Sequence, residues 1–137
     1  MKAFLDSCFL IYLNSMTDGG RGPLEELFRR MLSEQLFINM LVVDEVLYIS
    51  RRYGVPYDIT LGFLRDIVLP FSEIVPIGEE DLIPAEKYLM NYDLKPSDAI
   101  HLATMGKVGA NAIVTEDEGF DRVKEVRRIW LDRMPIS

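Results

Sequence analysis

The fold of this chain is decided by a stretch that reads Lys95-Pro96-Ser97-Asp98-Ala99-Ile100-His101-Leu102-Ala103-Thr104 and then Asn111-Ala112-Ile113-Val114-Thr115-Glu116-Asp117-Glu118-Gly119-Phe120. The first segment predicts a helix that begins near Pro96 and carries the carboxylate of Asp98 in its first turn. The second segment predicts a buried strand with Asp117 directly after it. In an open α/β sheet, ligands bind where strands end and helices begin, so we expect both carboxylates to face one crevice.

Outward from this stretch, the apolar pattern predicts strands that are separated by helices. The expected strands are Lys2–Leu5, Glu73–Ile77, Asn111–Thr115 and Arg128–Leu131, and the expected helices are Cys8–Asn14, Leu24–Leu32, Met40–Tyr53, Tyr57–Leu69, Glu79–Asn91 and Pro96–Lys107. Such an alternation implies a parallel sheet that is covered on both faces. We therefore expect an α/β fold, a three-layer α/β/α sandwich with a central parallel sheet of about four strands, as a single domain over residues 1–137.

Composition narrows the class of protein. The chain is 49% hydrophobic and 27% charged, which is typical of a globular protein. Its net charge of −7 argues against a general basic surface for nucleic acid, although an acidic site can bind phosphate through its cations. A single cysteine, Cys8, argues against a disulfide framework and a cysteine-based zinc site. With neither a signal peptide nor an apolar run of about 18 residues, we expect a cytoplasmic protein.

Two carboxylate positions earlier in the chain can be argued into the same crevice. Asp6 follows the first strand and precedes Ser7, where its simplest role is to cap the next helix. Asp44 and Glu45 stand among apolar residues in the middle of the third predicted helix. A carboxylate in such surroundings is costly to desolvate unless something pairs with it. A salt bridge with the arginine pair that follows is one alternative, and the pattern alone does not choose between Asp44 and Glu45.

The acids of the deciding stretch also have simpler interpretations. The helix macrodipole alone would stabilise Asp98 in a first turn. Asp117 stands among acidic neighbours, as solvated loops often do. His101 lies one turn beyond Asp98 on the same side of the helix. Without a second histidine nearby, it is more typical of a surface residue, or of a hydrogen-bonding residue behind the ligands, than of a metal ligand.

The order and the surroundings of these residues resemble the PIN-domain nucleases, and among them the small VapC-like toxins, over nearly the full length. The resemblance is carried by Leu5-Asp6-Ser7, Val43-Asp44-Glu45-Val46-Leu47, Ser97-Asp98-Ala99-Ile100-His101-Leu102-Ala103 and Ile113-Val114-Thr115-Glu116-Asp117-Glu118-Gly119-Phe120. It implies that the catalytic, metal-binding carboxylates are Asp6, Glu45, Asp98 and Asp117. It also implies supporting roles for Ser7 and Thr115 as hydroxyl groups and for Asp121 as a residue behind the ligands or an occasional additional ligand.

By the same resemblance, the chain would be a Mg²⁺- or Mn²⁺-dependent endoribonuclease that hydrolyses phosphodiester bonds of RNA, the toxin of a toxin–antitoxin pair. An antitoxin protein and a second copy of the chain would be its partners. The chemistry agrees, because a carboxylate cluster suits a hard cation such as Mg²⁺, which can activate water toward a phosphorus atom. The apolar stretches around Tyr48, Tyr53, Phe63 and Met90 exceed what one small sheet needs, and we expect some of them in a homodimer interface.

Two functions of other classes remain as alternatives. A phosphoaspartyl phosphohydrolase of the haloacid-dehalogenase kind would also begin with an acid after its first strand. It would normally carry a second aspartate two residues later, where this chain has Cys8. A non-catalytic RNA-binding or scaffolding module of the same fold would be expected to lack one or more of the acids, whereas all four positions are filled here.

Overall fold

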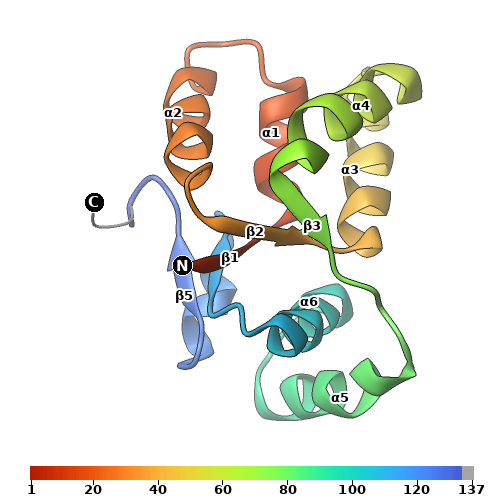
Figure 1. Cartoon of the computed structure of the whole chain (residues 1–137), viewed down its shortest axis with the longest axis vertical. Helices are drawn as coiled ribbons and strands as arrows, with labels where there is room; N and C mark the ends of the chain where they lie inside the picture. The colour runs from red at the N-terminus through yellow and green to blue at the C-terminus, as the bar shows by residue number, and fades with distance from the viewer. Residues whose placement is uncertain (134–137) are drawn as a thin grey trace.

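The computed structural model describes residues 1–133 and has the predicted three layers, with helices on both faces of a parallel sheet (Figure 1). The sheet order is β3-β2-β1-β4-β5, and its strands are β1 (Lys2–Leu5), β2 (Gln35–Ile38), β3 (Ser72–Ile74), β4 (Ala112–Val114) and β5 (Arg127–Ile129). The predicted fold class is therefore confirmed. Residues 134–137, the end of the expected domain, lie outside the described residues.

One helical layer is formed by the first half of the chain and the other by the second half (Figure 1). The first layer contains α1 (Ser7–Ser15), α2 (Arg21–Met31), α3 (Met40–Arg52) and α4 (Tyr57–Phe63). The second contains α5 (Leu82–Asn91) and α6 (Pro96–Val108). None of the helices in residues 1–133 is long and apolar enough to cross a membrane.

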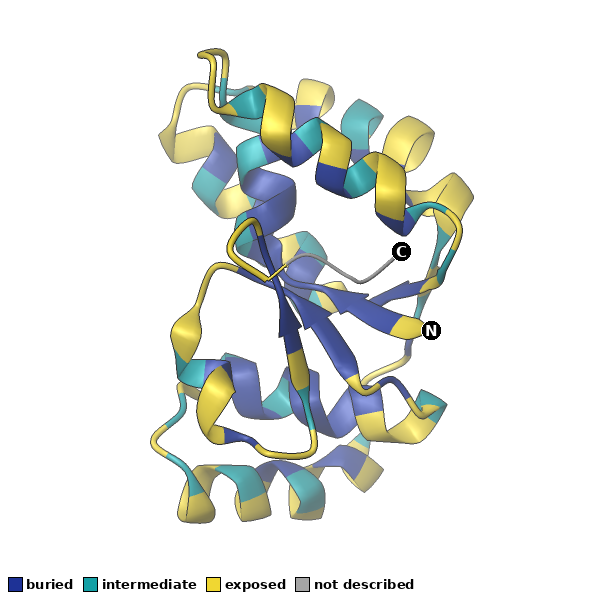
Figure 2. Cartoon of the chain, turned by 90° about the vertical axis from the view of Figure 1, so that its left-hand side faces the viewer, coloured by how far each residue is buried: buried dark blue, intermediate teal, exposed yellow. Residues whose placement is uncertain are grey.

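The central strand is β1, whose residues Ala3, Phe4 and Leu5 are completely buried. Figure 2 shows the same burial along most of the sheet, while the outer sides of the helices are exposed. A strand covered on both faces needs apolar residues at every position, which explains the unbroken apolar run. On its two sides β1 pairs in parallel with β2 and with β4.

The structure has one strand more than the apolar pattern predicts, namely β2. Its buried residues are Leu36, Phe37 and Ile38, and Asn39 follows directly. β1 has the same form, since it too is a short apolar run that ends in a polar residue, Asp6. The carboxyl ends of β2, β1 and β4 lie side by side in the sheet.

Two predicted helices differ in detail from the structure. The segment expected as one helix, Tyr57–Leu69, continues after α4 as a π-helix, Leu64–Val68, and a 3-10 helix, Leu69–Phe71. Pro70 lacks a backbone N–H group, so it cannot extend an α-helix at that point. The helix expected from Glu79 begins with one 3-10 turn, Glu79–Asp81, and becomes α-helical at Leu82.

Candidate metal centre

Asp6 stands where β1 ends and α1 begins, and it is only 6% exposed. Its Oδ1 accepts a hydrogen bond from the backbone N–H of Ser7 at 2.8 Å, so it does cap α1. Its Oδ2 accepts a hydrogen bond from the Thr115 hydroxyl, also at 2.8 Å. Each carboxylate oxygen has two lone pairs, so capping leaves Asp6 able to bind something further.

Asp98 lies in the first turn of α6, at the carboxyl edge of the sheet, and is 9% exposed. Among residues 1–133, no side chain or backbone group donates a hydrogen bond to its carboxylate. Burial and the negative charge of Asp6 raise the pKa of Asp98 to about 6, although His101 acts in the opposite direction. Burial also raises the pKa of Asp6, against the effect of His101. A positive charge between these carboxylates would relieve both penalties.

Asp117 follows β4 and begins a 3-10 helix, Glu118–Arg122. Its backbone N–H donates to the Thr115 hydroxyl oxygen at 3.1 Å, and its Oδ1 accepts from the backbone N–H of Gly119 at 2.8 Å. Thr115 thus contacts both acids, because its hydroxyl donates to Asp6 and accepts from Asp117. This places the hydroxyl between the loops that follow β1 and β4.

Glu45 projects from α3 toward the same place, and its Oε1 lies 3.1 Å from Nε2 of His101. Asp44, the competing position, is exposed and borders a different hollow, together with Tyr48 and Tyr57. Successive residues of a helix point about 100° apart, so only one of two neighbouring acids can face the sheet edge. Within the described chain, neither Arg51 nor Arg52, the arginines at the end of α3, forms an ion pair with Glu45.

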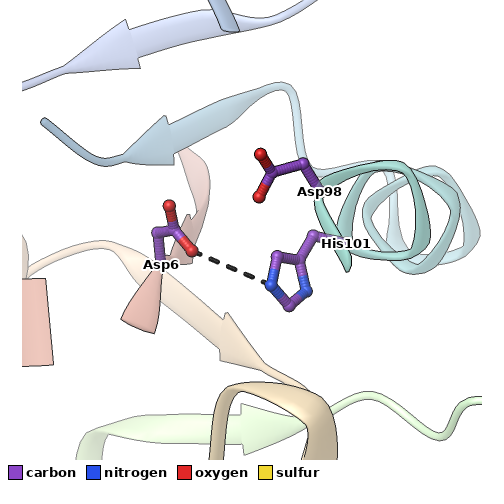
Figure 3. Close-up of side chains that lie close together, drawn as sticks. All are labelled: Asp6, Asp98 and His101. Carbon is purple, nitrogen blue, oxygen red and sulfur yellow. Dashed lines mark ion pairs between the residues drawn. The ribbon is translucent and has the colours of Figure 1, made fainter. Parts of the chain in front are cut away.

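His101 is completely buried, so it is not a surface residue, which was one of the two expectations for it. Its position beside Glu45 agrees with the other, a hydrogen-bonding residue behind the ligands. Its Nε2 lies 3.8 Å from Oδ1 of Asp6, and one ligand atom each from Asp6, Asp98 and His101 lie within 4.8 Å of one another (Figure 3). Behind it, the side chain of Asn39 lies 3.1 Å from Nδ1 of the ring. Asn39 has no counterpart among the residues that the sequence pattern selected.

One open cavity of about 390 Å³ lies beside these groups at the edge of the sheet. Its lining residues are Asp6, Ser7, Cys8, Glu45, Lys95, Ser97, Asp98, Glu116 and Asp117. All four predicted carboxylates are among them, with Ser7 beside them and Thr115 behind. The sequence pattern did not select four of the lining residues. Ser97 and Glu116 are adjacent to motif acids, Cys8 lies two positions after Asp6, and Lys95 lies three positions before Asp98.

Asp121 lies elsewhere. It is not among the residues that line the cavity, and its Oδ1 accepts hydrogen bonds from Arg128 Nε at 3.1 Å and from Arg133 Nη1 at 2.9 Å. Its expected role as an occasional ligand would require the side chain to leave both arginines.

The donor atoms of the cavity fit a hard divalent cation. Five of its lining side chains are carboxylates, and the basic residue among them is Lys95 at the start of α6. Cys8 also lines the cavity, but burial and the nearby charge of Asp6 raise the pKa of its thiol to about 12, so it stays protonated and is a poor ligand. Oxygen donors of this kind suit Mg²⁺ or Mn²⁺ better than a soft metal.

Comparison with known proteins gives a consistent result for the fold. The family model of the PIN domain matches residues 3–126. No curated protein sequence matches the chain.

Among solved structures, VapC20 of Mycobacterium tuberculosis, described as a sarcin–ricin loop cleaving toxin, has a TM-score of 0.73 at 18% identity, covering 91% of this chain and 98% of that one. A toxin–antitoxin complex from Klebsiella pneumoniae has a TM-score of 0.70 at 23% identity, covering 90% and 94%. VapBC2 of Rickettsia felis, bound to a promoter DNA fragment, has a TM-score of 0.73 at 14% identity, covering 95% and 98%.

Proposed function

Because this chain belongs to the PIN domain family, we propose that it is a metal-dependent endoribonuclease that hydrolyses phosphodiester bonds of RNA. The observation that carries the proposal is the convergence of Asp6, Glu45, Asp98 and Asp117, from four separate elements, on one cavity. Four carboxylates without arginine partners are unfavourable together unless cations are bound among them. We assign Mg²⁺ or Mn²⁺ to this position.

In this proposal Asp6 and Asp98 are the central ligands, because both are buried and burial raises the pKa of both. Glu45 and Asp117 line the same cavity and would complete the ligand set. The bound cation would activate a water molecule and stabilise charge on the phosphate. Thr115 holds Asp6 by its hydroxyl, and Lys95 at the rim supplies a positive charge for a phosphate of the substrate.

The similarity of the fold to VapC proteins and to toxin–antitoxin complexes supports the further proposal that the chain is the toxin of such a pair, acting in the cytoplasm. The same similarity supports an antitoxin protein as a partner.

A homodimer is supported by exposed apolar side chains, since Tyr53 is 72% and Met90 is 79% exposed. Tyr48 is also exposed, whereas Phe63 is half-buried against the core. Light scattering at tens of micromolar protein measures the oligomeric state, and a monomer would contradict the homodimer.

The function is tested with purified protein on a panel of structured and unstructured RNAs, in Mg²⁺ and in EDTA. We expect cleavage in Mg²⁺ only. Asp98→Asn changes charge with little change in shape, so it should keep the fold while cleavage falls by about tenfold or more. Circular dichroism of the variant checks the fold.

Cleavage that persists in EDTA, or an Asp98→Asn variant that cleaves as well as the wild type, would overturn the assignment of this cavity. Covalent phosphate recovered on Asp6 would indicate the phosphoaspartyl alternative instead. A folded wild type that binds RNA and metal but cleaves no member of the panel would favour the non-catalytic module.

A further inference from the structure

His101 has two possible roles in the metal centre. Its Nε2 is close to two of the proposed ligands, at 3.1 Å from Oε1 of Glu45 and 3.8 Å from Oδ1 of Asp6 (Figure 3). With a bare Nε2, the ring could coordinate the cation directly. With a proton on Nε2, it would donate a hydrogen bond to Glu45 and could not coordinate. Whether Nε2 of His101 carries a proton therefore decides whether His101 binds the cation or holds Glu45, which binds it.

Asn39 decides where that proton is. As the N-cap of α3, its Oδ1 accepts a hydrogen bond from the backbone N–H of Val42 at 3.0 Å. A backbone N–H only donates, so the orientation of the Asn39 amide is determined, and its Nδ2 faces Nδ1 of His101 and Oγ1 of Thr104, each at 3.1 Å. Since Nδ2 only donates, Nδ1 of the imidazole is the acceptor. The ring proton is then on Nε2, which faces Glu45.

Thr104 confirms the direction of the chain of hydrogen bonds. Its hydroxyl donates to the backbone carbonyl of His101 at 2.9 Å, so its oxygen is free to accept from Asn39. Asn39, Thr104 and His101 are all completely buried, so water does not compete for these groups. Every donor in the network has an acceptor, and reversing the Asn39 amide would leave α3 without its cap.

We propose that His101 is a positioning residue, which donates a hydrogen bond from Nε2–H to Glu45 and holds that carboxylate toward the cavity without binding the cation itself. This inference rests on the proposed function and deepens it. Glu45 has three rotatable side-chain bonds, and His101 is its one hydrogen-bond partner in residues 1–133. Without the histidine, nothing in that part of the chain would hold Glu45 in its place.

The network also connects the two helical layers. Asn39 caps α3, which carries Glu45, and its amide holds His101 on α6, which carries Asp98. These two helices lie on opposite faces of the sheet (Figure 1). The hydrogen bonds through Asn39 and His101 cross the carboxyl edge of the sheet and set the spacing of two proposed ligands.

Calorimetric titration with Mn²⁺, in the absence of RNA, tests the role of His101. We expect His101→Leu to weaken Mn²⁺ binding roughly 10- to 100-fold, the usual effect of losing a residue that orients a ligand. His101→Gln keeps an N–H donor at a similar reach and should recover part of the loss. In the Glu45→Gln background, His101→Leu should have little further effect, because its contribution acts through Glu45. Equal losses in both backgrounds would overturn the proposal.

Repeating the same titration with Co²⁺ and with Mg²⁺ provides a second criterion. An imidazole ligand would favour Co²⁺, so direct coordination predicts a larger loss for Co²⁺ than for Mg²⁺ when His101 is removed. A positioning role predicts similar losses for both cations. A selective loss of Co²⁺ affinity would therefore also overturn the proposal.

The tautomer itself can be measured, because His101 is the only histidine of the chain. We expect ¹⁵N NMR of the imidazole to show the proton on Nε2, both without metal and at saturating Mg²⁺. Asn39→Ser keeps a side-chain oxygen for the cap but removes the donor to Nδ1, so it should give a mixture of tautomers. A proton on Nδ1 in the wild type, or its transfer there when Mg²⁺ binds, would contradict the positioning role.

These measurements are independent of cleavage. If the wild type has the expected tautomer and the expected coupling between His101 and Glu45, but cleaves no RNA, the positioning role stands and the nuclease proposal fails. If RNA is cleaved but Nε2 carries no proton, the nuclease proposal stands and the positioning role fails.

Discussion

Two acidic clusters lie within a few residues of each other in the sequence, and their negative charges are compensated in different ways. In the Arg128 cluster, formed by Arg128, Asp121 and Asp132, the guanidinium group lies 3.1 Å from a carboxylate oxygen of each acid. In the candidate metal centre, Asp6 and Asp98 are buried with no lysine or arginine ion pair in the described chain. The acids around Arg128 are neutralised by a side chain of the protein itself. Buried acids without such a partner can instead be neutralised by a bound metal cation.

The two clusters share Thr115. Its backbone carbonyl accepts a hydrogen bond from Arg128 Nη1 at 3.3 Å, and its hydroxyl donates to Asp6. The Arg128 cluster thereby holds the loop after β4, on which the metal centre depends. We infer that one cluster serves stability and the other serves function, and four predictions test this division.

The largest expected effect is on RNA cleavage, in a pair of variants from the same turn. Asp117→Asn should lower the cleavage rate by about tenfold or more, because Asp117 lines the cavity. Asp121→Asn should lower it far less, because Asp121 is bound by two arginines. Rates are compared under single-turnover conditions. Equal losses in the two variants would indicate that Asp121 also binds the cation.

The next effect is on stability. Arg128→Met should lower the free energy of unfolding by about 2 kcal/mol, because it removes a buried guanidinium group that binds the carboxylates of Asp121 and Asp132 and the backbone carbonyl of Thr115. The matched control is Arg133→Met. Arg133 forms an ion pair with the same Asp121 but is exposed, so its loss should lower the free energy of unfolding by about 1 kcal/mol or less. Urea denaturation measures both. If the two losses are equal, the Arg128 cluster contributes no more than a surface ion pair.

The third effect is the response to metal. A cation that binds only the folded state at 100 times its Kd adds about 2.7 kcal/mol to the free energy of unfolding. We expect Mn²⁺ to raise the melting temperature of the wild type and of Arg133→Met. Asp98→Asn should lose most of this rise, because a ligand is gone. A full rise in Asp98→Asn would place the cation elsewhere.

The smallest effect is on pH dependence without metal. Since the pKa of Asp98 is raised from 3.8 to about 6, the folded state binds more protons than the unfolded chain between these values. Asp98 therefore lowers stability as pH rises through this window. In EDTA, Asp98→Asn should melt at or above the wild type near neutral pH and show a weaker pH dependence. A variant that melts well below the wild type would identify Asp98 as a structural group.

Much of this architecture can be predicted from local patterns. Unbroken apolar runs identify β1 and β4, and the polar residue at the end of each run marks the carboxyl edge of the sheet. The same logic applies to β2, with Leu36, Phe37 and Ile38 before Asn39, but four residues carry too little periodicity to separate a strand from the end of a helix. The π-helix after α4 depends on packing and has no comparable signal.

The residues of the proposed metal centre could likewise be predicted only in part. Asp6, Asp98 and Asp117 follow from their positions at element ends. The choice of Glu45 over Asp44 depends on the rotation of α3 about its axis, which tertiary packing determines. The partnership of Asn39 with His101 joins residues that are distant in sequence, so no pattern within either segment reveals it.

The sheet order has a consequence for folding during synthesis. β1 pairs with β4 through Ala3 and Ala112, so most of the described chain lies between these two neighbouring strands. Contacts of such long sequence separation form late, and domains emerge from the ribosome with their N-terminal part first. A nascent chain therefore exposes one edge of β1 and carries Asp6 without Asp98 or Asp117 until α6 and the loop after β4 have been made. The proposed centre needs these later elements, so a nascent chain that ends before them lacks the cavity in which a cation would bind.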